Sequence, residues 1–481
     1  MAEKGIEGGN YRPLSKESIE RIHETAMKVF EEVGIEVNSK EALDLFKHTN
    51  AQVDEHTRRV AIPRDMVMDL VSKAPSEVTL YARDRKHNIA LGGTRVYSGT
   101  GGTALNVIDR KNGQKRVATL NDLKEIAKLV DNLENIHIFM LPVYPSDVPV
   151  EKVDVNRFFA GLDNTRKHIM GGVYTPRGIE QVIKMAEIIA GSSRRLRERP
   201  IISMITCSIS PFKIDSLYGD MLVAIAKAGI PVVCPAEPLC GATSPVTLAG
   251  TLVVQVVDSL AGVIINQLAN PGAPVIYGSV ASSTDLRDMK YITGSVEMGL
   301  LNAAGAQMAQ FYKLPFYATG GMTDSNTIDA QCGYESSITN LLCALSGANF
   351  IHDAAGLMEF ALTMSYEKLV IDNEILGMVM RAVKGIEVND ETLAFDVIKQ
   401  AGPGGHFVSS RHTRTHMRRE HYEPTLSNRE FREKWEEQGS KDTFQKAKEQ
   451  VEEILDRPGY ELPSYVRSRI LTETPDIKGG D

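Results

Sequence analysis

The stretch Pro274-Val-Ile-Tyr-Gly-Ser-Val280 is a short apolar run of the kind that forms a buried β-strand. Residues 246–268 before it and residues 295–312 after it are each able to form a helix. A strand between two helices favours a parallel sheet, because parallel strands need crossover connections and are covered on both faces. This unit therefore predicts an α/β fold.

The same alternation extends in both directions along the chain and gives eight strand-like runs, each followed by a segment able to form a helix. The runs are residues 94–98, 136–141, 168–173, 201–206, 231–235, 274–280, 315–318 and 349–353. The helical segments include residues 120–131, 177–190, 214–228, 246–268, 295–312, 329–345 and 369–383. Eight such units in succession favour a closed (β/α)₈ TIM barrel over an open doubly wound sheet.

Two extensions flank the predicted catalytic barrel, which we place at residues 86–385. Residues 1–85 are interpreted as an N-terminal helical extension, with helices over 15–33, 41–47 and 63–72. Residues 386–481 are interpreted as a C-terminal helical extension, with one helix over 386–401, a break at 402–405 and a charged helix over 428–455. We expect this tail to pack on the barrel or on a neighbouring subunit of a homo-oligomer.

Composition narrows the class of protein. Of the 481 residues, 42% are hydrophobic and 24% are charged, which is ordinary for a globular protein with a sizeable core. No apolar run approaches the length that spans a bilayer, and residues 1–10 lack a signal-peptide core, so we expect no membrane and a cytoplasmic location. The net charge of -8 argues against nucleic-acid binding, and five cysteines form no disulfide framework.

Barrel enzymes carry their active sites at the C-terminal ends of the strands. Tyrosine is over-represented among the side chains expected there, and several rings around one cavity would suit a quaternary ammonium ion. Each tyrosine could instead be a core residue, because alternation along a strand turns half of the side chains toward the helices. The candidates are Tyr97, Tyr144, Tyr174, Glu237, Tyr277, Tyr317, His352 and Asp353.

Four other patterns bear on the function. The Gly-rich stretch at residues 98–103 is interpreted as a hairpin or loop, because the residues after it look extended and not helical. Cys234 and Cys240 lack the close spacing of a zinc site. The loop at residues 402–407 could bind an anion or be a flexible connector, and residues 411–419 form a basic island typical of an exposed docking face.

Four stretches together resemble the trimethylamine methyltransferase family, and the resemblance runs from about residue 14 to the charged tail. They are Phe30-Glu-Glu-Val-Gly-Ile35, Arg83-Asp84, Tyr317-Ala-Thr-Gly-Gly-Met-Thr-Asp-Ser325, and Gly402-Pro-Gly-Gly-His406 before Thr413. The resemblance implies a (β/α)₈ barrel and methyl transfer from a methylated amine to the cobalt of a separate corrinoid protein. It implies no cofactor bound permanently by this chain.

One departure from the family pattern bears on the substrate. The trimethylamine enzymes of the family carry pyrrolysine in the barrel, whereas every position here is a standard residue. A quaternary ammonium is already positively charged and releases a neutral amine, so it needs no such activation. The chain therefore looks like a non-pyrrolysine member, with glycine betaine or a related betaine as the expected substrate.

The resemblance, combined with the strand-end candidates, suggests roles for individual residues. The aromatic cage would be Tyr97, Tyr174, Tyr277 and Tyr317, with Glu237 facing the ammonium, His352 binding a carboxylate, and Asp324 and Asn326 as further lining residues. The corrinoid protein would approach the barrel mouth, with Gly402, Gly404, Gly405, His406, Arg411 and Arg414 as docking residues. No metal ligand is expected under this hypothesis.

Two other functions remain open at this level. A metal-dependent barrel lyase or aldolase could use Glu237, His352 and Asp353. A binding protein could hold a betaine without turnover. Bound metal in the purified protein would favour the first, and binding without methyl transfer would favour the second.

Overall fold

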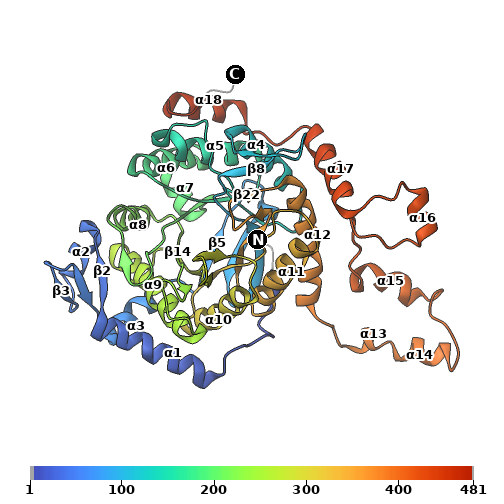
Figure 1. Cartoon of the computed structure of the whole chain (residues 1–481), viewed down its shortest axis with the longest axis horizontal. Coiled ribbons are helices and arrows are strands. Elements are labelled where there is room, and N and C mark those ends of the chain that lie inside the picture. Colours follow the sequence, from blue (N-terminus) through green and yellow to red (C-terminus); the bar gives the residue numbers. More distant parts are fainter. Residues whose placement is uncertain (1–4, 479–481) are drawn as a thin grey trace.

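A closed ring of eight parallel strands forms the centre of the computed structural model, which describes residues 5–478 (Figure 1). In order around the ring these are β7 (Arg95–Thr100), β10 (Ile138–Met140), β11 (His168–Gly172), β12 (Ile202–Ile205), β14 (Val232–Ala236), β16 (Val275–Ser279), β19 (Phe316–Thr319) and β20 (Phe350–Ala355). Pairing of β20 with β7 closes the ring. Each of the eight predicted runs forms one of these strands, so the predicted barrel is confirmed.

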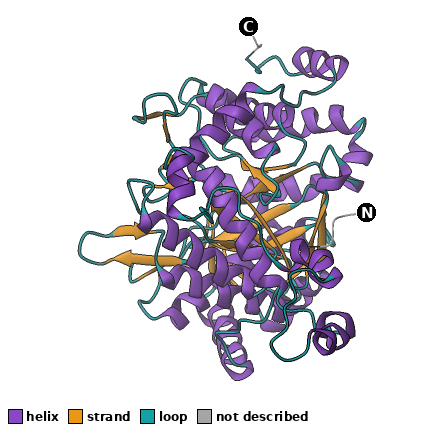
Figure 2. Cartoon of the chain, turned by 90° about the vertical axis from the view of Figure 1, so that its right-hand side faces the viewer, coloured by secondary structure: helices purple, strands orange, loops and turns teal. Residues whose placement is uncertain are grey.

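Helices surround the ring and connect each strand to the next (Figures 1 and 2). They are α4 (Leu120–Asp131), α5 (Val153–Asn164), α6 (Pro176–Ala190), α7 (Ser193–Glu198), α8 (Ser216–Ala228), α9 (Leu248–Ala269), α10 (Val296–Tyr312), α11 (Ala330–Leu345) and α12 (Tyr366–Lys384). None of the predicted helices corresponds to α5. Its polar residues Asp154, Asn156 and Arg157 are buried, so the helix lacks the polar face that periodicity detects.

Helix α9 is long and apolar enough to cross a membrane, contrary to the expectation that no apolar run approaches that length. It is a core helix of the barrel instead. Most of it is buried, and it packs against β14, β16 and the N-terminal helices. Its buried Gln255 and Ser259 hydrogen-bond to the backbone of strands β16 and β14, which fits a helix inside a protein.

A β-hairpin fills the end of the barrel where the strands begin. It consists of β5 (Glu77–Leu80) and β6 (Ile89–Gly92), and β6 leads directly into β7. The side chains of Val78, Leu80, Ile89 and Leu91 join the apolar interior of the barrel. A short strand, β1 (Ile6–Glu7), pairs with β7 on the same side. These residues form the floor of the barrel, which leaves its C-terminal end as the mouth.

The N-terminal extension is not purely helical, so that prediction is wrong in part. The three predicted helices are present as α1 (Lys16–Lys28) with the π-turn η1 (Val29–Val33), α2 (Lys40–Phe46) and α3 (Arg64–Lys73). Between them β2 (Ile35–Val37), β3 (Gln52–Asp54) and β4 (Arg59–Ala61) form a sheet with β13 (Lys213–Ile214). Strands of three residues are too short to give a visible alternation, and one partner comes from far along the chain.

The two long helices predicted in the C-terminal extension are both interrupted. Residues 386–401 form α13 (Asp390–Leu393) and α14 (Phe395–Ala401), because Ala394 adopts a left-handed φ of 52°. Residues 428–455 contain α16 (Arg432–Glu437) and α17 (Thr443–Asp456), because Gly439 and Ser440 have positive φ and Asp442 caps α17. The remaining helices are α15 (Arg411–Glu420) and α18 (Ser464–Glu473).

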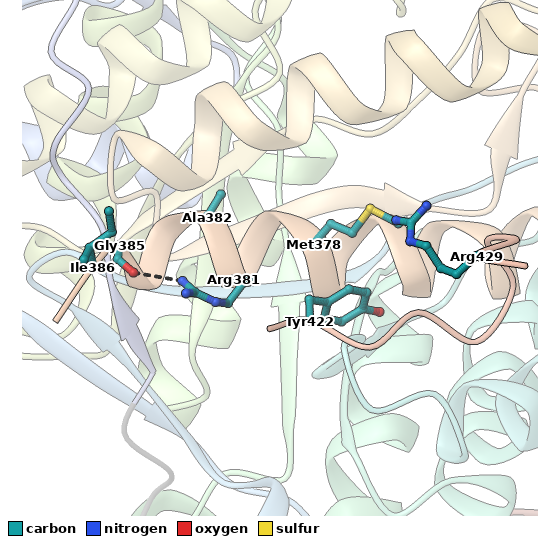
Figure 3. Close-up of a pocket in the computed structure, with 7 residues that line it drawn as sticks. All are labelled: Met378, Arg381, Ala382, Gly385, Ile386, Tyr422 and Arg429. Carbon is teal, nitrogen blue, oxygen red and sulfur yellow. Dashed lines mark hydrogen bonds between the residues drawn. The ribbon is translucent and has the colours of Figure 1, made fainter. Parts of the chain in front are cut away.

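Residues 386–421, called the arm below, project from the side of the barrel (Figure 1). The arm starts at the end of α12, and a helix that follows a barrel strand runs back toward the floor. The chain returns to α12 where Glu374 accepts hydrogen bonds from the backbone of residues 425–427. A cavity of about 420 Å³ lies at the base of the arm and is lined by Met378, Arg381, Ala382, Gly385, Ile386, Tyr422 and Arg429 (Figure 3).

Candidate active site at the barrel mouth

A cavity of about 300 Å³ lies at the C-terminal ends of the barrel strands. Four tyrosines, two carboxylic acids, one histidine and three sulfur-containing side chains are among the residues that line it. These are Tyr174, Tyr218, Tyr291, Tyr317, Glu237, Asp353, His352, Met140, Cys207 and Met322, with Thr103 beside them. No lysine or arginine lines this cavity within residues 5–478.

Asp353 is held in an unusual backbone conformation at the end of β20. Its φ is 60°, in the left-handed region that non-glycine residues rarely occupy. A β-carbon on Gly101 would lie 1.4 Å from Asp353 Oδ1 and 2.3 Å from its α-carbon. Gly101 therefore makes room for the acid, which explains the Gly-rich stretch after β7 without a nucleotide.

His352 is fixed on three sides. Its ring stacks on Tyr317 with centroids 4.5 Å apart, and Nδ1 lies 3.0 Å from the Thr319 hydroxyl. Thr319 donates its own proton to the Ser279 carbonyl, so it accepts from Nδ1. Nε2 lies 2.8 Å from Asp353 Oδ1, although this oxygen has no hydrogen-bond partner among the residues that the structure describes. The role predicted for His352 in binding a substrate carboxylate remains a prediction.

Glu237 follows β14 and projects into the cavity. Its carboxylate has no hydrogen-bond or ion-pair partner within the described part of the chain. Burial, and then the charge of Asp353, raise the pKa of this carboxyl to about 7. The hydroxyl of Tyr291 is buried nearby and also lacks a partner among residues 5–478. Glu237 is exposed at the mouth, so the cavity presents an acid that a ligand cation can reach.

Arg157, on the helix that the sequence analysis missed, lies behind the opposite wall of the cavity. The guanidinium is fully buried and donates to the Tyr174 hydroxyl at 3.3 Å and to the Thr103 hydroxyl at 3.1 Å. It also donates to the carbonyls of Leu141 and Val143. It forms no ion pair with any residue that the structure describes. No local pattern in the sequence marks this residue, because its role depends on contacts with Tyr174 and Thr103, which lie 17 and 54 residues away.

Two predicted cage tyrosines lie elsewhere, so those assignments are wrong. Tyr97 is in the barrel interior toward the floor, where its hydroxyl accepts from the backbone N–H of Gly5. Tyr277 points out of the ring toward the helices and donates to Gln255 Oε1 at 3.0 Å. Alternation along β16 turns Tyr277 outward, in agreement with the alternative interpretation of this tyrosine as a core residue. Tyr174, Tyr317, Glu237 and His352 are brought together in the cavity.

The two lining candidates in the loop after β19 also lie apart from the cavity. Asp324 is half-buried and accepts hydrogen bonds from the N–H and hydroxyl of Thr293. Asn326 is exposed. Asp324 therefore supports the neighbouring hairpin, β17 (Ser282–Asp285) with β18 (Lys290–Ile292), and both assignments as lining residues are corrected.

The predicted docking residues all lie on the arm. Gly402, Gly404, Gly405, His406, Arg411 and Arg414 are exposed there. Because the arm leaves the barrel on the floor side of α12, the structure does not place them at the mouth of the same chain. Their docking role remains a prediction that needs another subunit or another surface.

The rim of the mouth is rich in exposed apolar side chains. They come from the loops that follow five different barrel strands, and such loops surround the mouth of a barrel. They are Leu105, Val150, Ile209, Val246, Leu286 and Met289, the last two at the tip of the β17–β18 hairpin. Exposed apolar residues gathered around a cavity are typical of a protein interaction site.

The structure offers no support for a metal centre. Glu237, His352 and Asp353 line one cavity, but residues 5–478 contain no group of three His, Cys, Asp or Glu side chains that could hold a metal ion. Cys234 and Cys240 are buried free thiols, and Cys240 Sγ lies 3.2 Å from the Thr251 hydroxyl.

Sequence comparisons place the chain among methylamine-related methyltransferases. Residues 4–466 match the family described as Trimethylamine methyltransferase (MTTB). The chain is 38% identical over 478 residues to trimethylamine methyltransferase MttB of Desulfitobacterium hafniense (strain DSM 10664 / DCB-2), covering 98% of this chain and 96% of that one. It is 36% identical over 448 residues to the glycine betaine methyltransferase of Desulfitobacterium hafniense (strain Y51), covering 92% of each.

A solved structure supports the architecture. The crystal structure of the Methanosarcina barkeri monomethylamine methyltransferase (MtmB) is similar, with a TM-score of 0.50 over 97% of this chain and 89% of that chain. The sequence identity is 12%, so this likeness concerns the fold alone.

Proposed function

The chain belongs to the trimethylamine methyltransferase family, and from that premise we propose that it demethylates a quaternary amine, glycine betaine or a related betaine. The acceptor would be Co(I) of a separate corrinoid protein. All 481 positions are standard residues, so the pyrrolysine that would activate a tertiary amine is absent from the sequence. The relative named glycine betaine methyltransferase supports a betaine as the substrate.

The observation that carries the proposal is the unpartnered Glu237 carboxylate among tyrosine rings at the barrel mouth. A trimethylammonium group cannot donate a conventional hydrogen bond, so it is held by negative charge and by aromatic faces. Glu237 lines the cavity without a hydrogen-bond or ion-pair partner among the described residues, so its carboxylate is available to a cation. The single negative charge of the ionised Glu237 matches the single positive charge of a quaternary ammonium group.

The side chains of the cavity would bind, orient and desolvate the substrate. Tyr317 is held by stacking on His352 and by a 3.6 Å contact between its hydroxyl and Met140 Sδ, so its ring is already in place. A bound cation would displace water from a cavity of about 300 Å³, which strengthens its attraction to Glu237. The leaving amine is neutral, so the chain needs no general acid. The corrinoid supplies the nucleophile that accepts the methyl group.

The apolar rim of the mouth fits a protein partner that must reach this cavity. A corrinoid protein docked there would contact Leu286 and Met289 on the β17–β18 hairpin. The proposed docking site is therefore the rim, whereas the arm residues would serve another contact.

We propose that a second copy of this chain covers the arm. Ile386, Phe395 and Val408 on the arm are exposed by 86%, 69% and 82%. The basic island at residues 411–419 complements a chain whose net charge is -8. The proposed compartment is the cytoplasm, where the five free cysteines would stay reduced.

The proposal is tested by incubating the purified full-length chain with free cob(I)alamin and a set of methylated amines. The expected result is loss of one methyl group from a quaternary amine, measured by mass spectrometry, together with the absorbance change of methylated cobalamin. Failure with every quaternary amine would contradict the proposal. Binding without transfer would indicate a binding protein, and a stoichiometric divalent metal in the purified chain would revive the lyase hypothesis.

A further inference from the structure

Arg157 is a buried charge without a charged partner in contact. It is 0% exposed and forms no ion pair with the residues described here. The nearest acid on its helix, Asp154, accepts instead from the backbone N–H groups of Tyr174 and Thr175. Buried charges in proteins are normally paired, because removal from water is costly. The charge of Asp154 interacts with that of Arg157, but no carboxylate bonds to the guanidinium directly, so it is placed to act on a further anion.

Two hydroxyl groups separate Arg157 from the cavity. A guanidinium has donors only, so both Tyr174 and Thr103 must act as acceptors toward it. The Tyr174 hydroxyl directs its own hydrogen to Thr103 Oγ1 at 3.4 Å. Thr103 Oγ1 thus accepts twice, and its hydrogen has no acceptor within residues 5–478. Thr103 lines the cavity, so this hydrogen is available to a ligand.

The two ends of the cavity carry opposite polarity. Thr103 and Tyr174 follow β7 and β11, which flank β10, and Arg157 lies on the helix after β10. Glu237 follows β14 and Tyr291 follows β16, on the other side of the eight-stranded ring. A zwitterion with its ammonium near Glu237 would direct its other end toward Thr103.

We infer that Arg157, acting through the hydroxyls of Tyr174 and Thr103, forms the carboxylate-binding end of the cavity and selects betaines over quaternary amines without an acid group. This inference rests on the proposed function and deepens it. Thr103 would donate to the carboxylate directly, and Tyr174 would relay polarisation from the guanidinium. Arg157 is a positioning residue, because it acts through the two hydroxyls.

The test compares glycine betaine with choline, which has the same trimethylammonium group and a hydroxyl in place of the carboxylate. Binding of each compound to the full-length chain is measured by calorimetry without a corrinoid, and KM and kcat are measured with free cob(I)alamin. Thr103→Val and Tyr174→Phe should each raise the glycine betaine Kd and KM about tenfold, as expected for a lost hydrogen bond to a charged group. The choline values should stay within about twofold.

Two further variants separate binding from folding. Thr103→Ser keeps the hydroxyl and should retain glycine betaine affinity. Tyr144→Phe removes a hydroxyl from a ring that packs on Tyr174 at 5.7 Å but does not line the cavity, and should leave both affinities unchanged. Arg157→Met loses four hydrogen bonds and could unfold the loop after β10, so the conclusion rests on the hydroxyl variants.

The outcomes distinguish this inference from the proposed function. Equal weakening of glycine betaine and choline in Thr103→Val, an unchanged glycine betaine affinity, or no binding of glycine betaine to the wild type would each overturn the inference. Selective weakening without methyl transfer would leave the inference standing and remove the proposed function. Methyl transfer from both compounds with no effect of Thr103→Val would overturn the inference and leave the proposed function standing.

Discussion

The barrel mouth and the arm use the same kinds of side chain in opposite ways. At the mouth, rings such as Tyr317 are buried, and the exposed Glu237 lines the cavity. On the arm, Phe395 and Val408 are exposed to solvent. The interior of the mouth is thus packed by contacts within one chain, whereas its rim and the arm both carry apolar side chains that this chain does not cover. Changes at the mouth should alter chemistry, and changes on the arm should alter association.

The largest effect is expected from Glu237→Gln. Removing the unpaired carboxylate should lower kcat/KM for a quaternary amine about 100-fold, as for the loss of one partner of a buried charge pair. The rates are measured with free cob(I)alamin. Glu180→Gln on the exposed face of α6 is the matched control and should be silent. An unchanged kcat/KM in Glu237→Gln would mean that the mouth does not hold the cation by charge.

Gly101→Ala tests how tightly the residues of the mouth are packed. The new methyl group would meet the Asp353 backbone at 2.3 Å, so we expect a loss of about 2 kcal/mol of unfolding free energy. Urea unfolding measures the loss, and quaternary amine binding should fall with it. Gly333→Ala, in α11 with open space around it, should not destabilise the chain. A stable Gly101→Ala variant with normal binding would contradict the geometry proposed for Asp353.

The mouth should respond to pH through Glu237. Its carboxyl has a pKa of about 7 in the empty cavity, so it is mostly protonated at lower pH and mostly ionised at higher pH. A cation favours the ionised form, so its affinity should fall about tenfold between about pH 8 and about pH 6. Calorimetry at several pH values measures this slope. The slope should vanish in Glu237→Gln, and a slope that persists in this variant would assign the pH dependence to another group.

The arm should give the smallest effect on the barrel. Replacing Phe395 and Val408 by Asp together should change the unfolding free energy by less than about 0.5 kcal/mol, because neither side chain packs on the barrel. The same variant should shift the sedimentation of the protein toward the monomer. Gln400→Asp, an exposed polar position on α14, is the control. An oligomer that survives the double substitution would show that another surface joins the subunits.

The sequence predicts the barrel well and its additions less well. The eight strands are apolar on both faces, and long helices such as α4 and α6 begin at caps that the sequence displays. The interrupted tail was missed because Ala394 and Ser440 adopt positive φ, which only glycine announces in a sequence. Helix α5 was missed because its polar residues are buried by tertiary contacts.

The candidate site was predicted in part for a similar reason. Placing residues at strand ends correctly selects Tyr174, Glu237, Tyr317 and His352 for the mouth. It cannot determine whether a side chain points into the barrel or outward to the helices, and Tyr277 points outward. It also cannot reveal Arg157, whose hydrogen bonds reach loops from two other strands. Family resemblance supplies the chemistry, and the tertiary structure supplies the polarity of the cavity.

The hairpin that fills the floor has a kinetic consequence. With Val78, Leu80, Ile89 and Leu91 occupying one end, the small molecule and the proposed corrinoid protein share the opening at the other. A docked protein would therefore retain a small molecule that is already in the cavity and would prevent another from entering. A cavity with a single opening imposes ordered binding. The amine must bind before the partner protein docks, and the product can leave only after the partner protein dissociates. High concentrations of the partner protein should then inhibit turnover, because the partner would cover the opening before the amine has bound.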